Sequence, residues 1–163
     1  MGTDTTRSVD AKDLSVTFES WYASAWPAAR RLAALLTQDL SAGEEVAQEA
    51  LLVLYQRWGE IENPDAYLNR TVINMASNWR RHKGTARSKI HLLGTDGFND
   101  LEANELIDAI ADLPFRQRAV VVLRYYYDLQ ESEIADWIGC RPGTVKSLSS
   151  RALAQLSKKV PRR

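Results

Sequence analysis

Apolar residues along the chain recur at intervals of three and four positions, which is the period of an α-helix. Extended alternation of apolar and polar residues, the mark of a half-buried strand, is absent. The pattern predicts helices over residues 18–36, 41–58, 64–81, 101–113, 114–129, 131–139 and 142–160. We therefore expect an all-α fold.

Polar residues and prolines indicate where several of these helices begin. Ser41 stands three residues before Glu44, a spacing typical of a capping box, so we expect Ser41 to cap the second helix. Asn63 followed by Pro64 predicts an N-cap and a first helical residue for the third helix. Pro27 lies inside the first helical pattern, where we expect a break or a fresh first turn.

Residues 84–101, GTARSKIHLLGTDGFNDL, interrupt the helical pattern. Three glycines together with Thr, Ser, Asn and Asp are typical of a linker. The sequence therefore predicts two small helical domains joined by a flexible linker, the second domain containing a helix-turn-helix. The expected bounds are a disordered N-terminus at 1–14, a first domain at 15–84, the linker at 85–101 and a second domain at 102–163.

The helix that includes residues 67–83, YLNRTVINMASNWRRHK, has an unusual polar face. Its apolar side carries Leu68, Val72, Met75, Ala76 and Trp79. Its polar side carries Arg70, Asn74, Asn78 and Arg81, and the segment contains no acid, although an ordinary solvated helix mixes Glu with Lys. Asn is a poor helix former. It offers a donor and an acceptor to a partner and repels no phosphate.

The last two helices form a helix-turn-helix pattern, in which Gly139 is the turn glycine and Pro142 begins the second helix. The residues that point back to the core are Val145, Leu148, Ala152 and Leu156. The residues left outward are Thr144, Lys146, Ser147, Ser150 and Arg151. Such a helix can enter a major groove, with its early residues at base edges and its basic residues on phosphates. The alternative is a generic helical hairpin with a solvated basic end.

Charge is unevenly distributed, although the formal net charge is zero. Basic residues without any acid occupy 69–91 and again 142–163, and acids without Lys or Arg occupy 92–112. The neutral total therefore hides two candidate surfaces for phosphate.

Composition narrows the class of protein. Hydrophobic residues make up 45% of the 163 residues and charged residues 26%, as in soluble globular chains. No run approaches the roughly 20 apolar residues of a membrane span, and the first residues lack the apolar stretch of a secretory signal. The lone Cys140 can form no internal disulfide. We expect a cytoplasmic protein without membrane insertion.

Residues for catalysis or metal binding are not grouped in the sequence. His82 and His91 have no Cys or carboxylate partners at metal-ligand spacing. GTARSK lacks the glycine spacing and the GK[ST] ending of a phosphate loop. We therefore expect no catalytic residues, no metal and no cofactor.

Five segments together resemble the bacterial RNA polymerase sigma factors of the extracytoplasmic-function (ECF) group, in the short form with two helical domains. The segments are FESWYASAWPAARRLAALLTQD, AGEEVAQEALLVLYQRW, NPDAYLNRTVINMASNWRR, LPFRQRAVVVLRYYYDL and ESEIADWIGCRPGTVKSLSSRAL. Their order and spacing cover the chain from about Thr17 to Val160 and are more specific than any one of them.

The resemblance implies a transcription initiation factor that binds core RNA polymerase, at the β′ clamp helices and the β flap, and directs it to promoter DNA. The expected core polymerase contacts are Glu45, Gln48, Glu49 and Leu52. The expected contacts to the unwound non-template strand at the −10 element are Asn63, Arg70, Asn74, Asn78, Arg80 and Arg81. The expected contacts to the −35 duplex are Arg141, Thr144, Lys146, Ser147, Ser150 and Arg151.

Further expectations concern the −10 loop, the helix caps and a regulator. Trp58 and Tyr67 flank the loop at 61–65 and are the better candidates to stack on an exposed base. Gln130 and Arg141 stand where the family commonly has Ser or Thr caps, which puts the starts of the last two helices in doubt. Factors of this group are usually held inactive by an anti-sigma partner, so one is expected here.

Two other classes of protein fit parts of the pattern. A stand-alone helix-turn-helix repressor or activator would bind its duplex tightly without polymerase. A helical protein-interaction module would tolerate the loss of Arg81 and Arg151.

Overall fold

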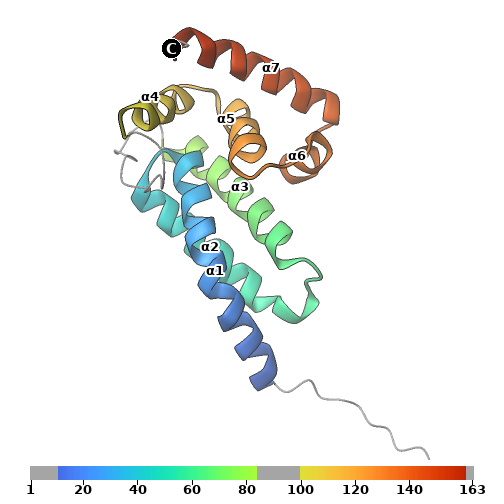
Figure 1. The fold of residues 1–163 in the computed structure, drawn as a ribbon. Helices are drawn as coiled ribbons and strands as arrows, with labels where there is room; N and C mark the ends of the chain where they lie inside the picture. The colour runs from blue at the N-terminus through green and yellow to red at the C-terminus, as the bar shows by residue number, and fades with distance from the viewer. Residues whose placement is uncertain (1–10, 84–99, 161–163) are drawn as a thin grey trace, which may run out of the picture.

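The structure, a computed structural model, describes residues 11–83 and 100–160 (Figure 1). An N-terminal half contains α1 (Ala11–Thr37), α2 (Leu40–Gln56), a 3₁₀ turn η1 (Trp58–Glu60) and α3 (Pro64–Lys83). A C-terminal half contains α4 (Asp100–Ala111), α5 (Phe115–Val121), a π-helical turn η2 (Val122–Tyr126), α6 (Glu131–Ile138) and α7 (Pro142–Lys159). The described residues contain no strand, so the predicted all-α class is confirmed.

The predicted domain bounds can be compared with the helices only at their edges. Residues 1–10 and 84–99, where we expected a disordered N-terminus and a linker, lie outside the described residues. α1 begins at Ala11, four residues before the expected start of the first domain. α4 begins at Asp100, inside the stretch expected to be linker.

α1 runs without interruption past Pro27, so the predicted break is wrong. A proline inside a helix removes one backbone hydrogen bond and crowds the preceding turn. Here the carbonyl that loses its partner belongs to the exposed Ala23, where water can reach it. Ala25, Ala29 and Leu32 on both sides of the proline are buried in one core. Packing therefore holds the helix together across the proline.

α2 begins at Leu40 rather than after Ser41, and its cap is Asp39. The Ala42 amide donates to Asp39 Oδ1 at 3.0 Å. Asp is as good an N-cap as Ser, and the turn at Gln38 (φ 60°) places it one position before the helix. The capping box predicted for Ser41 and Glu44 is therefore wrong.

Gly43 lets α1 and α2 pack closely. A Cβ added at this glycine would lie 2.7 Å from the backbone N and Cα of Ala34 on α1. Backbone atoms cannot give way as the end of a flexible side chain can, so the two helices can reach this separation only with glycine here.

The predicted start of α3 is confirmed. Asn63 Oδ1 accepts a hydrogen bond from the Ala66 amide at 3.1 Å, and Pro64 is the first helical residue. Leu68, Val72 and Ala76 are buried against α1 and α2, as the apolar spacing predicts.

The helix-turn-helix is formed by α6 and α7. Gly139 ends α6 with φ of 70°, in the left-handed region that the turn requires, and Pro142 begins α7. Gln130 precedes α6, and its backbone amide donates to Glu133 Oε2 at 2.9 Å, which is one half of a capping box. Both helices therefore start where the sequence predicts, despite the absence of Ser or Thr caps.

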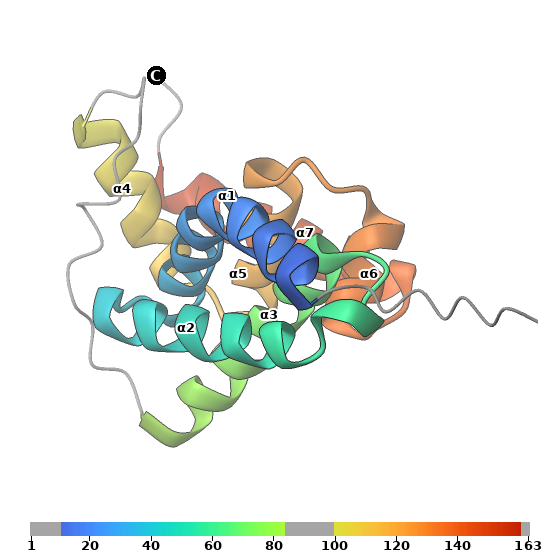
Figure 2. The same cartoon turned by 90° about the horizontal axis from the view of Figure 1, so that it is seen from below.

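The two halves share one hydrophobic core. Ala29 and Leu32 of α1 and Val72 of α3 belong to the same buried cluster as Val120 of α5 and Ile134 of α6. Figure 1 shows α5 and α6 covering the upper end of α1 and α3, with α7 crossing above them. Figure 2, seen from below, shows α1 beside α2 and α3, with the C-terminal helices behind.

Arg118 of α5 is fully buried between the halves and serves as a cap for two helices. Its Nη1 donates to the Leu36 carbonyl at the end of α1 at 2.7 Å. Its Nη2 donates to the carbonyls of Ala111 and Leu113, both at 2.8 Å, and its Nε to that of Ile110 at 3.2 Å, where α4 ends. Neither α1 nor α4 has a basic residue in its own last turn. One guanidinium therefore lies at the negative ends of two helix dipoles, one from each half.

Candidate nucleic-acid interface

The acid-free face of α3 is exposed to solvent. Asn63, Arg70, Asn74, Asn78 and Arg81 are all exposed. The four that follow Asn63 lie within roughly 80° of one another around the helix, because successive residues turn by about 100°. They therefore form one stripe that could follow a nucleic-acid strand.

Two further polar residues of α3, Arg80 and Asp65, differ from the members of this stripe in burial or in charge. Arg80 is half-buried, so less of its side chain is available to a strand than that of the exposed Arg81. Asp65 is the acidic residue in the first turn of α3, and its Oδ1 accepts a hydrogen bond from the indole Nε1 of Trp21 at 2.9 Å. That bond joins α1 to the start of α3.

Trp58 is packed against aromatic residues of α1. Its ring centroid lies 5.1 Å from that of Phe18, edge to face, and 5.1 Å from that of Trp21. Trp58 thus packs with Phe18 and Trp21, and Trp21 in turn is hydrogen-bonded to Asp65 of the segment 61–65. Base stacking by Trp58 and Tyr67 stays a prediction, and the contacts with Phe18 and Trp21 leave less of the Trp58 ring available.

The exposed Arg57 and the half-buried Tyr67 form a pair that the sequence pattern did not predict. The Arg57 guanidinium lies 5.8 Å over the Tyr67 ring, and its Nη1 donates to the Tyr67 hydroxyl at 3.3 Å. Hydrogen bonds to Glu60 and Tyr67 raise the pKa of Arg57 above its ordinary value. The pair presents a cation and an aromatic face, two groups that bind single-stranded nucleic acid. The available signal was an arginine four residues before the predicted loop.

The outward residues of α7 lie mostly as predicted. Arg141, Lys146, Ser147, Ser150 and Arg151 are exposed, and Thr144 is half-buried. Val145, Ala152 and Leu156 are buried on the opposite side, and Leu148 is half-buried against the core.

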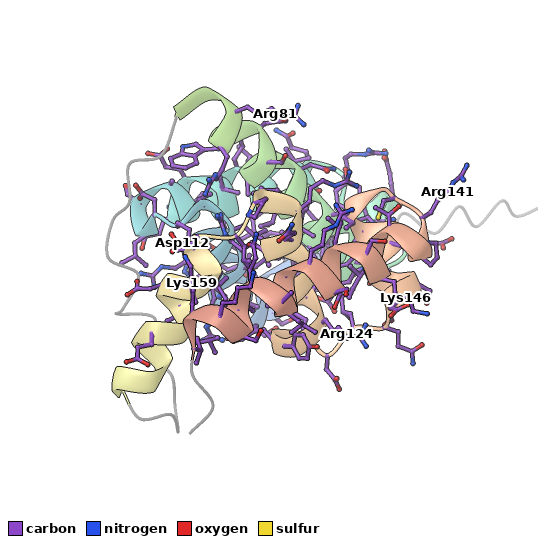
Figure 3. All side chains as sticks on the ribbon, turned by 90° about the horizontal axis from the view of Figure 1, so that it is seen from above. Arg81, Asp112, Arg124, Arg141, Lys146 and Lys159 are labelled. Atoms are coloured by element: carbon purple, nitrogen blue, oxygen red, sulfur yellow. The ribbon has the colours of Figure 1, made fainter. Side chains whose placement is uncertain are left out.

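Basic residues lie along α7 and at both of its ends. Figure 3 shows Arg141 and Lys146 at the end of α7 away from Lys159 and Asp112. The Lys159 ammonium forms an ion pair with the Asp112 carboxylate, so it is already engaged within the fold. No acidic residue occurs from Pro142 onward, so the exposed Lys146 and Arg151 meet no acid on their own helix.

α2 exposes a mixed face. Glu45, Gln48 and Glu49 are exposed, and Leu52 is 56% exposed. Tyr55, one turn further, is 52% exposed and was not among the predicted contacts. Two large apolar side chains on one helix face, bordered by acids, are typical of a protein-binding surface.

The described part of the chain holds neither a metal site nor a membrane-spanning helix. Within 11–83 and 100–160, no three His, Cys, Asp or Glu side chains lie close enough together to hold a metal ion. The side chain of His82 and the whole of His91 lie outside the described side chains. Over the same ranges, no helix combines the length and the apolar character needed to cross a membrane.

Known proteins resemble both the fold and the sequence. The family model described as Sigma-70, region 4 matches residues 103–156. The structure of the sigma factor RpoE in complex with the anti-sigma factor NepR from Bartonella quintana has the same fold, with a TM-score of 0.75 and 23% identity, over 90% of this chain and 99% of that one.

The RNA polymerase sigma-E factor of Streptomyces coelicolor is 32% identical over 151 residues, which is 88% of this chain and 85% of the relative. The sigma-E factor of Streptomyces antibioticus is 33% identical over 141 residues, 78% of this chain and 76% of the relative. These relatives count against a stand-alone repressor and confirm the family inferred from the sequence. The chain belongs to the RNA polymerase sigma factors of the ECF group.

Proposed function

We propose that this initiation factor binds core polymerase through α2, reads the −35 duplex with α7 and holds the unwound −10 strand along α3. The single observation that carries the proposal is the pair of exposed, basic stripes without acid, on α3 and α7, in a chain of zero net charge. Two such surfaces fit one strand and one duplex better than they fit a protein partner.

The −10 site is proposed to comprise the α3 stripe and the Arg57–Tyr67 pair. Asn74 and Asn78 offer donors and acceptors to an exposed base edge. Arg70 and Arg81 follow the phosphates, and Tyr67 stacks on a base. Capture of a base offsets the few kcal/mol that unstacking costs, and so favours strand separation.

The −35 site is proposed to lie at the beginning of α7. Arg141, Thr144, Lys146 and Ser147 occupy the first turns, the part of a recognition helix that reaches base edges. Ser150 and Arg151 follow one turn later, where a phosphate contact fits.

The α2 face is proposed as the polymerase-binding surface, since Leu52 and Tyr55 supply apolar area and Glu45 and Glu49 supply charge. The β′ clamp helices and the β flap are the proposed docking partners. RNA synthesis is then catalysed by polymerase, and this chain catalyses no reaction itself. We propose that it acts in the cytoplasm. Because a structural relative was crystallised with an anti-sigma factor, we propose such a partner here too.

Run-off transcription with purified core polymerase tests the proposal. The protein should direct initiation from promoters selected out of its genomic DNA, and core polymerase alone should not. Failure to bind core, or to initiate at any selected promoter, would refute it.

Salt titration of promoter binding tests the α7 contacts. Lys146→Ala should lower the slope of log affinity against log salt by about 0.9, the value for one lost phosphate contact. Lys158→Ala is the matched control, because Lys158 is exposed on the same helix about 18 Å further along the axis. Equal slopes for both variants and wild type would exclude Lys146 from the phosphate contacts.

A further inference from the structure

The start of α3 is tied to α1 by a hydrogen bond between two residues that are not part of the proposed −10 site. The Trp21 indole donates from Nε1 to Asp65 Oδ1 at 2.9 Å, although 44 residues separate the two. The half-buried Trp21 ring has its centroid 5.9 Å from that of Phe18 and 5.1 Å from that of Trp58. An indole packed against two rings has few orientations, and its N–H can only donate. Trp21 therefore offers Asp65 a partner in a defined position.

Asp65 lies on the opposite side of α3 from the residues proposed to read the strand. Successive helical residues turn by about 100°, which places Asp65 roughly 180° from the middle of the α3 stripe. The same count places Tyr67 within the sector of the stripe. The bond therefore holds the first turn of α3 from the side of α1 and leaves the opposite side free for a strand.

The first turn of α3 has few other restraints. The first amides of a helix have no partner within it. Here the Asn63 side chain accepts from the Ala66 amide and the Asn63 carbonyl accepts from the Tyr67 amide, each at 3.1 Å. Leu68 is the first buried residue of the helix. The direction of the turn before Leu68 therefore depends on these caps and on Trp21, whereas the rest of α3 is fixed by the core.

We infer that Trp21 is a positioning residue for the −10 strand, which orients through Asp65 the turn that presents Asn63 and Tyr67. The inference rests on the proposed function, because it takes Asn63 and Tyr67 as strand contacts. A merely structural role would weaken the folded chain as a whole, and with it all three proposed surfaces. A positioning role predicts a loss confined to the −10 strand, since Trp21 and Asp65 lie on neither α2 nor α7.

Four variants separate these roles. Trp21→Phe removes the N–H but keeps an aromatic ring between its neighbours. Asp65→Ala removes the acceptor, and Asp65→Asn restores an Oδ1 that can accept the same bond without charge. Trp26→Phe is the matched control, because it makes the same change five residues further along α1, at an indole stacked on Tyr22 with centroids 6.3 Å apart.

Template binding by the complex of the full chain with core polymerase tests the inference. One template carries the −35 duplex of a selected promoter and an unpaired non-template strand at −10, and the other carries the −35 duplex alone. Trp21→Phe and Asp65→Ala should each lower affinity for the first template about 3- to 10-fold, the range that loss of one hydrogen bond supports. Asp65→Asn should regain most of that loss, and Trp26→Phe should stay within about twofold of wild type. All four variants should bind core polymerase and the −35 duplex as wild type does.

Four results would overturn the positioning role. They are wild-type affinity of Trp21→Phe for the first template, an equal loss of its binding to core or to the −35 duplex, equal losses in Asp65→Asn and Asp65→Ala, and a loss in Trp26→Phe as large as in Trp21→Phe. Failure of the proposed −10 function is recognised without any variant. In that case the wild-type complex binds both templates equally, and the inference falls with the function.

Discussion

Replacing Arg118 with methionine should be among the most damaging single changes in this protein. Methionine is unbranched and apolar, so it fills much of the same space but donates no hydrogen bond. The change removes the common cap of α1 and α4 and leaves three buried carbonyls, those of Leu36, Ala111 and Leu113, without this donor.

The size of the loss follows from these bonds. Each carbonyl left without a partner costs about 1–3 kcal/mol. Burying the guanidinium costs the wild-type protein several kcal/mol of desolvation. The methionine variant avoids this cost, which offsets part of its loss of stability. We expect a net loss of about 3–5 kcal/mol in the free energy of unfolding, in line with other buried charged groups that lose a partner. For a chain of this length, that lowers Tm by about 10 °C.

Urea unfolding followed by circular dichroism and by tryptophan fluorescence measures this change. The control is Arg116→Met, which alters an exposed arginine on the same helix and should stay within about 0.5 kcal/mol of wild type. A loss below about 1 kcal/mol in Arg118→Met, or one equal to that of Arg116→Met, would refute the capping role.

Three further predictions concern packing, ionisation and docking. Gly43→Ala should destabilise the protein by about 1–3 kcal/mol because its Cβ meets backbone, whereas Gly143→Ala, which meets nothing within 4 Å, should be neutral or slightly stabilising in thermal melts. Burial raises the pKa of Tyr127 above its ordinary value of 10.0, so its stabilising effect is complete below about pH 10 and is lost as pH rises further. Absorbance titration should show one of the six tyrosines ionising last, together with unfolding, and that step should vanish in Tyr127→Phe; six equal ionisations in the folded protein would contradict this. Leu52→Asp should leave stability unchanged but weaken core polymerase binding at least about tenfold in a pull-down titration, and unaltered binding would remove α2 from the docking surface.

Local signals in the sequence predicted much of the fold because the physics behind them is local. Asn63 and Pro64 satisfy the first turn of α3 whatever surrounds them, and Gly139 supplies a backbone conformation that other residues resist. The same reasoning failed at Pro27 and Ser41. At Pro27 packing by distant residues outweighs a lost hydrogen bond, and at Ser41 a second good cap stands two residues earlier.

The contacts between the halves could not be predicted from local pattern. Arg118 lies one turn after Pro114, on the same helix side as the apolar Val121 and Val122. A charged residue on the apolar side of a helix is unusual. Its partner Leu36 is 82 residues away, and spacing alone carries no information on that distance. In contrast, the residues of the α3 stripe were all correctly predicted to face outward, because exposure follows directly from the helical period.

The π-helical turn η2 lies within the C-terminal half and sets how α6 and α7 are oriented relative to α5. A π turn takes in one residue more than the α-helix it interrupts. Since one helical position corresponds to a rotation of about 100°, the extra residue in Val122–Tyr126 turns everything after it relative to α5. Without that residue, α6 and α7 would be rotated relative to α5, and Tyr127 would no longer face α1. A codon gained or lost at this point is therefore expected to turn the whole helix-turn-helix relative to α5, without changing the exposed residues of α7.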